Sequence, residues 1–108
     1  MKGVEELAVQ RVLQRFEHEI VKVNRKNIGE ITGEVSNRDL LSLGEAISIC
    51  RAKYLKSVLE VAKNRDETLE ARLASEVRTK RLLYEETMQG FAALRTALER
   101  GYVVIREV

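Results

Sequence analysis

The absence of proline from all 108 residues is the feature that most constrains the fold of this chain. Proline interrupts helices and removes donors from sheet ladders, so a chain without it can form long continuous helices. Only 6 glycines are present, and charged residues make up 33% of the chain. Such a composition, rich in Leu, Glu, Ala, Arg and Lys, is typical of long helices and coiled coils. The sequence therefore predicts an all-α protein.

A first helix is predicted over about residues 4–24, because apolar residues recur there at spacings of four and three. The residues that share this apolar face are Val9, Leu13, Phe16, Ile20 and Val23. The period then stops, and the glycines and asparagines around residues 25–36 predict a loop. A short extended piece through Ile31 and Val35 is a further expectation for this loop.

A second helix is predicted over about residues 37–63, because a capping box precedes it. Ser36 can accept a hydrogen bond from the first turn while Asp39 reaches back to the chain before it. Apolar residues then form two neighbouring arcs that together span more than half of the helix circumference. A helix that is apolar on two sides packs against two neighbours, so we expect this helix to be central.

Residues 66–100 form the third and longest predicted helix, and its connection to the second leaves two alternatives. The apolar pattern lapses from Lys63 to Thr68, and Asn64 with Glu67 can form another capping box, which favours a tight turn. A single helix from about residue 38 to residue 100 is the alternative, since no glycine or proline forces the turn. We predict the turn, and hence one domain over residues 1–108 with a long α-hairpin and a short N-terminal helix.

The tail, residues 101–108, is predicted to leave the last helix and to form a short strand. Gly101 follows Glu99 and Arg100, as a helix C-cap does. The β-branched residues after it would pair with residues 28–35 or with a second copy of the chain.

The apolar stripe of the third helix predicts self-association. At ~1.5 Å rise per residue this helix would be about 50 Å long, more than the first helix can cover. A second copy would cover the rest, so we expect a homo-oligomer, with a dimer as the first expectation. The residues predicted to form the interface are Leu43, Ile47, Tyr54, Leu69, Leu73, Val77, Met88 and Phe91. The leading functional hypothesis is a non-enzymatic oligomerisation or adaptor protein that binds other helices.

Three basic residues interrupt these apolar faces. Arg51 falls between the two arcs of the second helix, where it would either extend to the rim or form a buried ion pair that fixes register. Lys80 and Arg95 lie on the apolar face of the third helix, as polar residues do in coiled-coil interfaces. They could instead line a groove for an acidic partner.

A nucleic-acid partner is the second hypothesis. The net charge of +2 neither demands nor excludes it. The candidate phosphate contacts of a small dimeric regulator are Arg72, Arg78, Lys80 and Arg81. They scatter around the helix and have acidic neighbours at i, i+4, namely Glu76 for Lys80 and Glu85 for Arg81, so a salt-bridged solvated face is the favoured interpretation.

Catalytic and metal-binding patterns are absent from the sequence. His18 is the only histidine and has no second ligand at helical spacing, and Cys50 lies on an apolar stripe as an inert core thiol. There is no glycine-rich phosphate loop, no Ser/His/Asp set and no CxxC. We therefore predict neither an enzyme nor a cofactor.

The spacing Arg11-x6-His18 resembles the paired residues of the HEPN ribonucleases. In these small all-α dimeric proteins an Arg and a His on one helix face RNA at a dimer cleft. The resemblance would imply an RNA-directed helical enzyme built around Arg11 and His18, which is the third hypothesis. Here the pair lies in the first helix rather than a late one, and Val12 stands where the family has a polar residue.

A cytoplasmic protein is expected, because a single cysteine rules out a disulfide framework within the chain. The first residues become acidic at Glu5 and Glu6, where a signal peptide would be apolar. No apolar run approaches the ~18 residues that a membrane span requires, so no membrane partner is predicted.

Overall fold

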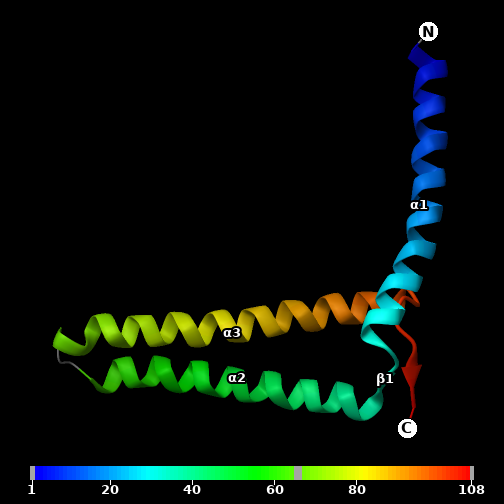
Figure 1. Ribbon diagram of the computed structural model, residues 1–108. Helices are drawn as coiled ribbons and strands as arrows, with labels where there is room; N and C mark the ends of the chain where they lie inside the picture. Colours follow the sequence, from blue (N-terminus) through cyan, green and yellow to red (C-terminus); the bar gives the residue numbers. More distant parts are fainter. Residues whose placement is uncertain (1, 65–66, 108) are drawn as a thin grey trace.

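The structure, a computed structural model that describes residues 2–64 and 67–107, has three helices and one short pair of strands (Figure 1). Helix α1 spans Lys2–Thr32, α2 spans Asn37–Lys63 and α3 spans Glu67–Glu99. The strands are β1 (Val35–Ser36) and β2 (Ile105–Arg106). The predicted all-α class is confirmed.

Helices α2 and α3 lie side by side and antiparallel, as an α-hairpin (Figure 1). The prediction of a turn is thereby confirmed, and the alternative of one continuous helix is wrong. Helix α2 ends at Lys63, and the next residue, Asn64, caps it by donating its backbone amide to the carbonyl of Glu60 (3.1 Å). The second capping box, predicted for Asn64 and Glu67, depends on a side chain outside the described part of the chain.

Apart from Ala97, the apolar side chains of α2 and α3 that are buried or half-buried recur at spacings of three and four, which places them on one face of each helix. Together with three polar neighbours on the same face, we call them the hairpin interface: Leu40, Leu43, Ile47, Cys50, Tyr54 and Ser57 on α2, and Leu73, Val77, Lys80, Tyr84, Thr87, Phe91, Leu94 and Leu98 on α3. Within it only Ile47, at 8% exposure, is buried. The hairpin therefore has a core only one layer of side chains thick.

Helix α1 continues to Thr32, so the predicted helix end near residue 24 and the loop over residues 25–36 are wrong. Gly29 is accommodated inside the helix, whereas Gly33, just after its end, adopts a positive φ (+68°). The Gly33 amide donates to the Gly29 carbonyl (2.9 Å), which closes a left-handed helix cap. The apolar period lapses after Val23 because residues 25–27 are exposed, and an exposed stretch of helix needs no apolar face.

The segment after α3 connects the hairpin to α1. Gly101 has φ +72° and, as predicted, caps the helix: the Tyr102 amide donates to the Ala97 carbonyl (2.8 Å) and the Gly101 amide to Leu98 (3.1 Å). The side chain of Tyr102 meets α1 at Asn24. Their hydrogen bond, with further hydrogen bonding and positive charge from Arg100, holds the pKa of Tyr102 below its ordinary value.

Strands β1 and β2 pair in parallel, with Val35 opposite Ile105 and Ser36 opposite Arg106. The Val35 amide donates to the carbonyl of Val104 (2.9 Å). The expected pairing of the tail with residues 28–35 is thus confirmed for Val35, the last residue of that range. Because β1 directly follows α1 and β2 follows α3, this pair fixes the base of α1 against the base of the hairpin.

The molecule is strongly elongated, since α1 stands away from the hairpin instead of packing along it (Figure 1). Its extents are 69 × 47 × 17 Å and its radius of gyration is 21.9 Å. A compact domain of this length would have a radius of gyration of about 13 Å. Most of α1 therefore has no neighbour within the described part of the chain.

The capping box at the start of α2 forms as predicted. The Ser36 hydroxyl accepts from the Asp39 amide (3.1 Å), and the Asp39 carboxylate accepts from the Ser36 amide (2.9 Å). The bond from the Ser36 amide, with further hydrogen bonding from the Ser36 side chain, stabilises the charged carboxylate and holds the pKa of Asp39 below its ordinary value of 3.8. Ser36 is itself buried, at 8% exposure, beside the strand pair.

This cap predicts a pH-dependent stability. A carboxyl whose pKa is lowered on folding stabilises the fold above its unfolded pKa, and the contribution is lost as pH falls through the folded pKa. We expect Ser36→Ala to reduce the free energy of unfolding by about 1 kcal/mol at neutral pH. Because Ser36→Ala keeps the backbone amide that donates to Asp39, the pH dependence is tested with Asp39→Ala, whose loss of stability should shrink below about pH 4. Urea unfolding of the unmodified protein and both variants at several pH values measures these losses, and a loss for Asp39→Ala that stays constant into acid would contradict the role of its carboxylate.

Candidate interaction surface

The apolar stripe of α1 is exposed along nearly its whole length. We define the α1 stripe as Val9, Leu13, Phe16, Ile20 and Val23, the residues that share one helix face. Ile20 is half-buried, and the other four side chains are between 45% and 58% exposed. Every residue from Gly3 to Glu19 is exposed. An amphipathic helix without a partner is only marginally stable in water, so this stripe is an unfilled packing surface.

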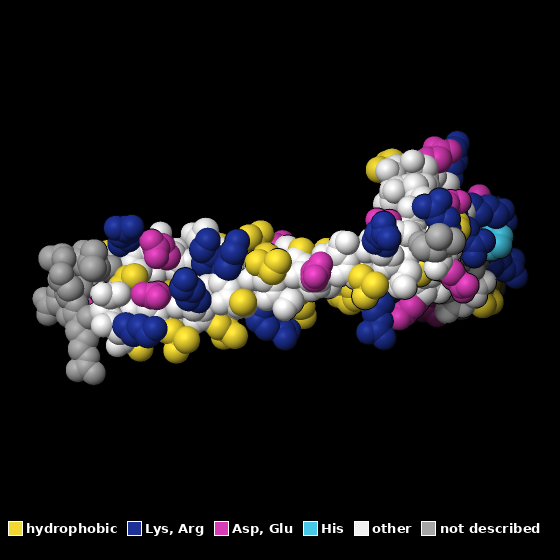
Figure 2. Space-filling model, turned by 90° about the horizontal axis from the view of Figure 1, so that it is seen from below, with side chains coloured by type: hydrophobic (Ala, Val, Ile, Leu, Met, Phe, Trp, Pro, Cys, Tyr) yellow, Lys and Arg dark blue, Asp and Glu magenta, His cyan; other side chains and the backbone are white. Residues whose placement is uncertain are grey.

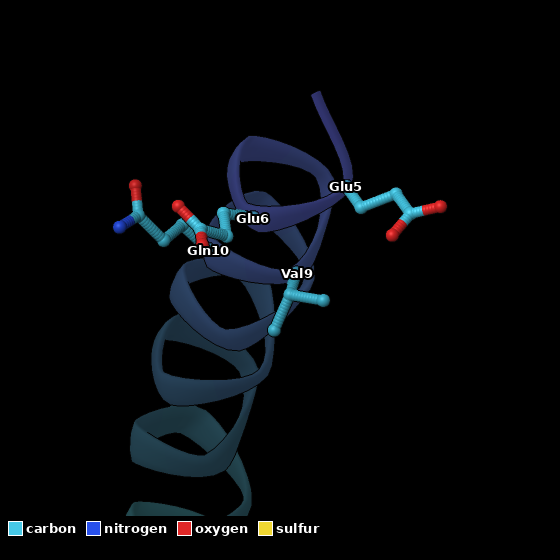
Figure 3. Close-up of a pocket in the computed structure, with 4 residues that line it drawn as sticks. All are labelled: Glu5, Glu6, Val9 and Gln10. Atoms are coloured by element: carbon cyan, nitrogen blue, oxygen red, sulfur yellow. The ribbon is translucent and has the colours of Figure 1, made fainter. Parts of the chain in front are cut away.

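The N-terminal end of the α1 stripe is flanked by polar side chains (Figure 3). Glu6 and Gln10 leave one side of the helix and Glu5 leaves the other, with Val9 between them. A shallow hollow here is lined by these four residues, all from α1. Since all four residues come from one helix, the hollow is open and does not enclose a small molecule.

The accessible surface of the chain gives the size of the unfilled surface. The described structure exposes 9101 Å². A compact monomer of this mass would expose about 6,100 Å², so about 3,000 Å² is in excess. An obligate dimer buries roughly 2,000–5,000 Å² in total, or about half of that per chain. The excess is therefore as large as the surface that a permanent partner covers.

A second unfilled apolar surface lies on the hairpin. The outer arc of α2, which lies beside the hairpin interface rather than within it, exposes Leu41, Leu55 and Leu59 by 52–67%. Figure 2 shows hydrophobic side chains spread along the hairpin among charged ones. Near the base, the small residues Gly44 and Ser48 leave a hollow of about 580 Å³, which is lined by Leu40, Leu41, Gly44, Glu45, Ser48, Phe91, Arg95 and Leu98. The second neighbour expected for this helix is therefore not supplied by the described part of its own chain.

The residues predicted as the oligomer interface lie mainly between α2 and α3 of one chain. Those that are buried or half-buried in the hairpin interface are Leu43, Ile47, Tyr54, Leu73, Val77 and Phe91. Met88 lies at its edge, at 38% exposure, and the side chain of Leu69 is outside the described part of the chain. The structure thus uses these residues inside the chain, and the exposed apolar surface lies elsewhere. The α1 stripe was visible in the sequence, but nothing in its pattern revealed that it would lack an internal partner.

Arg51 lies at the rim of the hairpin rather than in a buried ion pair. Its side chain is exposed, and its Nε donates to the Tyr84 hydroxyl (2.9 Å). The guanidinium carbon is 5.3 Å from the centre of the Tyr84 ring, which also stacks on Tyr54 at 6.2 Å. The rim interpretation therefore holds within one chain, while an ion pair between chains stays a prediction.

Lys80 and Arg95, the other two basic residues predicted on an apolar face, have different surroundings. Arg95 is exposed and donates to the carboxylate of Glu99 (2.9 Å). Lys80 is half-buried in the hairpin interface and borders a hollow with Lys53, Lys56 and Glu76. This hollow mixes both signs of charge, so it does not form a uniform binding site for an anion.

The four candidate phosphate contacts do not gather on one face. At about 100° per residue, Arg78 and Arg81 lie on one side of α3 and Arg72 and Lys80 on the other. Arg81 pairs with Glu85 as predicted (3.8 Å). Glu76 pairs with Arg72 (3.4 Å), not with Lys80 as predicted. Acidic neighbours thus reduce the positive potential of this group.

Arg11 and His18 lie on the side of α1 opposite the α1 stripe, and both are exposed. Cys50 is half-buried in the hairpin interface, as expected for a core thiol. Among the described residues, no group of three His, Cys, Asp or Glu side chains could hold a metal ion. Over the same residues, no helix contains an apolar stretch long enough to cross a bilayer.

Comparisons of the chain with protein-family models, with curated proteins and with solved structures gave no match.

Proposed function

We propose that this protein is a non-enzymatic helical assembly protein that acts by packing its helices against those of other chains. The observation that carries the proposal is the exposed α1 stripe, which repeats at the spacing of a coiled coil and meets no described residue of its own chain over its N-terminal half. In this proposal the hairpin is an antiparallel coiled coil that acts as the rigid body, and α1 is the element that recruits a partner.

Association would supply the stability that α1 lacks. Burying a Val, Leu, Ile or Phe side chain contributes about 1.5–3 kcal/mol, and the α1 stripe offers five such residues in each chain. The gain is reduced by the entropy lost on association. The helical structure of α1 is therefore coupled to assembly, and a homodimer is the simplest assembly that buries the stripe.

A second protein partner would use the outer arc of α2. Its exposed leucines and the hollow at Gly44 and Ser48 allow another helix to approach closely. This combination of self-association and a free groove is what an adaptor requires. The acidic neighbours of Arg72 and Arg81 favour a protein over a nucleic acid as that partner.

Size-exclusion chromatography with light scattering, recorded at 260 and 280 nm, tests the proposal. We expect twice the chain mass of 12.3 kDa, or a higher multiple, with a protein-like absorbance ratio. With 3 tyrosines and no tryptophan, the protein absorbs weakly at 280 nm, so bound nucleic acid would be obvious. A monomer at about 100 μM would refute the proposal, since even a weak dimer forms at that concentration. A raised 260 nm signal that disappears at high salt would support the nucleic-acid hypothesis instead.

A further inference from the structure

We propose that the α1 stripe binds the same stripe of a second copy of this chain, with the two α1 helices antiparallel. The inference rests on the proposed function and specifies its first partner and the orientation of that partner. Three observations carry it: the heptad spacing of the stripe, the charges that flank it, and the surface that the single chain leaves exposed.

The heptad pattern of α1 separates core positions from flanking positions. Val9, Phe16 and Val23 occupy one core position, and Leu13 and Ile20 occupy the other. Continued towards the N-terminus, the second core position falls on Glu6. Glu5 and Lys26 occupy the same flanking position in different heptads, one near each end of the stripe. Flanking charges set partner choice and orientation in coiled coils.

An antiparallel pairing places the five apolar core residues opposite other apolar residues or at the edge, and it pairs both flanking charges. When Leu13 lies opposite Phe16 of the second copy, Val9 lies opposite Ile20. The same register brings Glu5 beside Lys26 of the second copy, and the two-fold symmetry repeats this pair at the other end. Glu6 then lies against Val23, where it can reach solvent at the edge. An ion pair between Glu5 and Lys26 thus lies at each end of the apolar layers.

A parallel pairing fits the same residues poorly. It would place Glu6 against Glu6 of the second copy in the first layer, where the two like charges repel. Glu5 would lie beside Gln10 and Lys26 beside no acidic residue of the stripe, so neither charge would be paired. The charges of α1 therefore favour the antiparallel orientation.

The surface excess agrees with a second copy as the occupant. The single chain exposes 9101 Å², about 3,000 Å² more than a compact monomer. A dimer joined through α1 removes part of this excess from each chain by one symmetric contact. The polar residues opposite the stripe, Arg11, His18 and Arg25, stay in solvent in this arrangement.

Disulfide trapping tests the orientation, in a chain whose own cysteine is removed by Cys50→Ser. We expect Val9→Cys/Ile20→Cys to form a covalent dimer under mild oxidation, because the two positions face each other across the antiparallel pair. The single variant Val9→Cys is the matched control, since only a parallel pair brings two copies of residue 9 together. Both substitutions fall on the stripe and not on the hairpin interface, and circular dichroism checks that the helices remain.

A charge exchange gives a second, non-covalent measurement. Glu5→Lys should raise the dissociation constant of the dimer roughly three- to tenfold at low salt, because it places a new positive charge beside Lys26 at both ends. The double exchange Glu5→Lys/Lys26→Glu should restore the dissociation constant of the unmodified dimer. In a parallel pair the first substitution would place a lysine beside Gln10 and change little.

The outcomes separate this inference from the proposed function. Efficient trapping of Val9→Cys alone would overturn the antiparallel orientation. A dimer by light scattering that neither cysteine variant traps, and that the charge exchange leaves unchanged, would place the contact outside the α1 stripe; it would overturn the role of α1 as the recruiting element but leave assembly by helix packing intact. A monomer would overturn both.

Discussion

Phe16→Glu is expected to convert the proposed dimer to a 12.3 kDa monomer in light scattering at micromolar concentration. Phe16 is 58% exposed in the single chain, at the centre of the α1 stripe, so the substitution leaves the hairpin intact. A dimer would lose two buried phenylalanines, or about 3–6 kcal/mol, and would have to bury two carboxylates. The dissociation constant should therefore rise by about 10²–10⁴-fold. Helicity should fall as well, because α1 without a partner is marginal.

His18→Glu is the matched control for this experiment. It introduces the same side chain two residues along the same helix, on the face opposite the α1 stripe. The mass and helicity of this variant should match those of the unmodified protein. If both variants dissociate, the effect is one of helix propensity or net charge. If neither dissociates, α1 does not hold the assembly together.

Ile47→Ala should cause the largest loss of fold stability of any single truncation in the hairpin. Ile47 is the most buried side chain of the hairpin interface, at 8% exposure, and this thin core has few atoms that can relax into a cavity. Truncating isoleucine to alanine at such a site costs about 2–5 kcal/mol. Urea unfolding at a fixed protein concentration measures the loss, since assembly makes apparent stability depend on concentration.

Ile49→Ala makes the same chemical change two residues away. Ile49 is 54% exposed, on the side of α2 that faces solvent, so its truncation should change the free energy of unfolding by less than about 0.5 kcal/mol. The two variants share helix propensity and composition, and they differ only in burial. Equal losses would mean that α2 packs through a different face in solution.

Much of the fold was predictable because its signals are local. The capping box at Ser36 and Asp39 fixes the start of α2, and Gly101 fixes the end of α3. These motifs satisfy backbone groups within a few residues, so they need no tertiary information. The apolar periods of the helices are local in the same sense, and the hairpin follows from them once the turn is accepted.

The features that could not be predicted from the sequence depend on contacts between residues that are distant in the chain. The end of α1 was misplaced because Gly29 and Gly33 look alike in sequence, and only the second adopts the left-handed conformation. The apolar residues of α2 and α3 were recognised, but a pattern cannot say whether its partner is in the same chain or another. For α2 and α3 the choice depends on their antiparallel packing against each other, and for the α1 stripe it depends on where α1 points, which the strand pair fixes.

The strand pair also implies an order of events in folding. Val35 and Ile105 are distant in sequence, and the whole hairpin lies between them. Closing so long a loop in an unfolded chain is entropically costly, whereas a formed hairpin already brings its two ends together. The hairpin should therefore form first and the strands pair last. Until then α1 is free to turn at Gly33, so chains that meet early can associate before the angle between α1 and the hairpin is set.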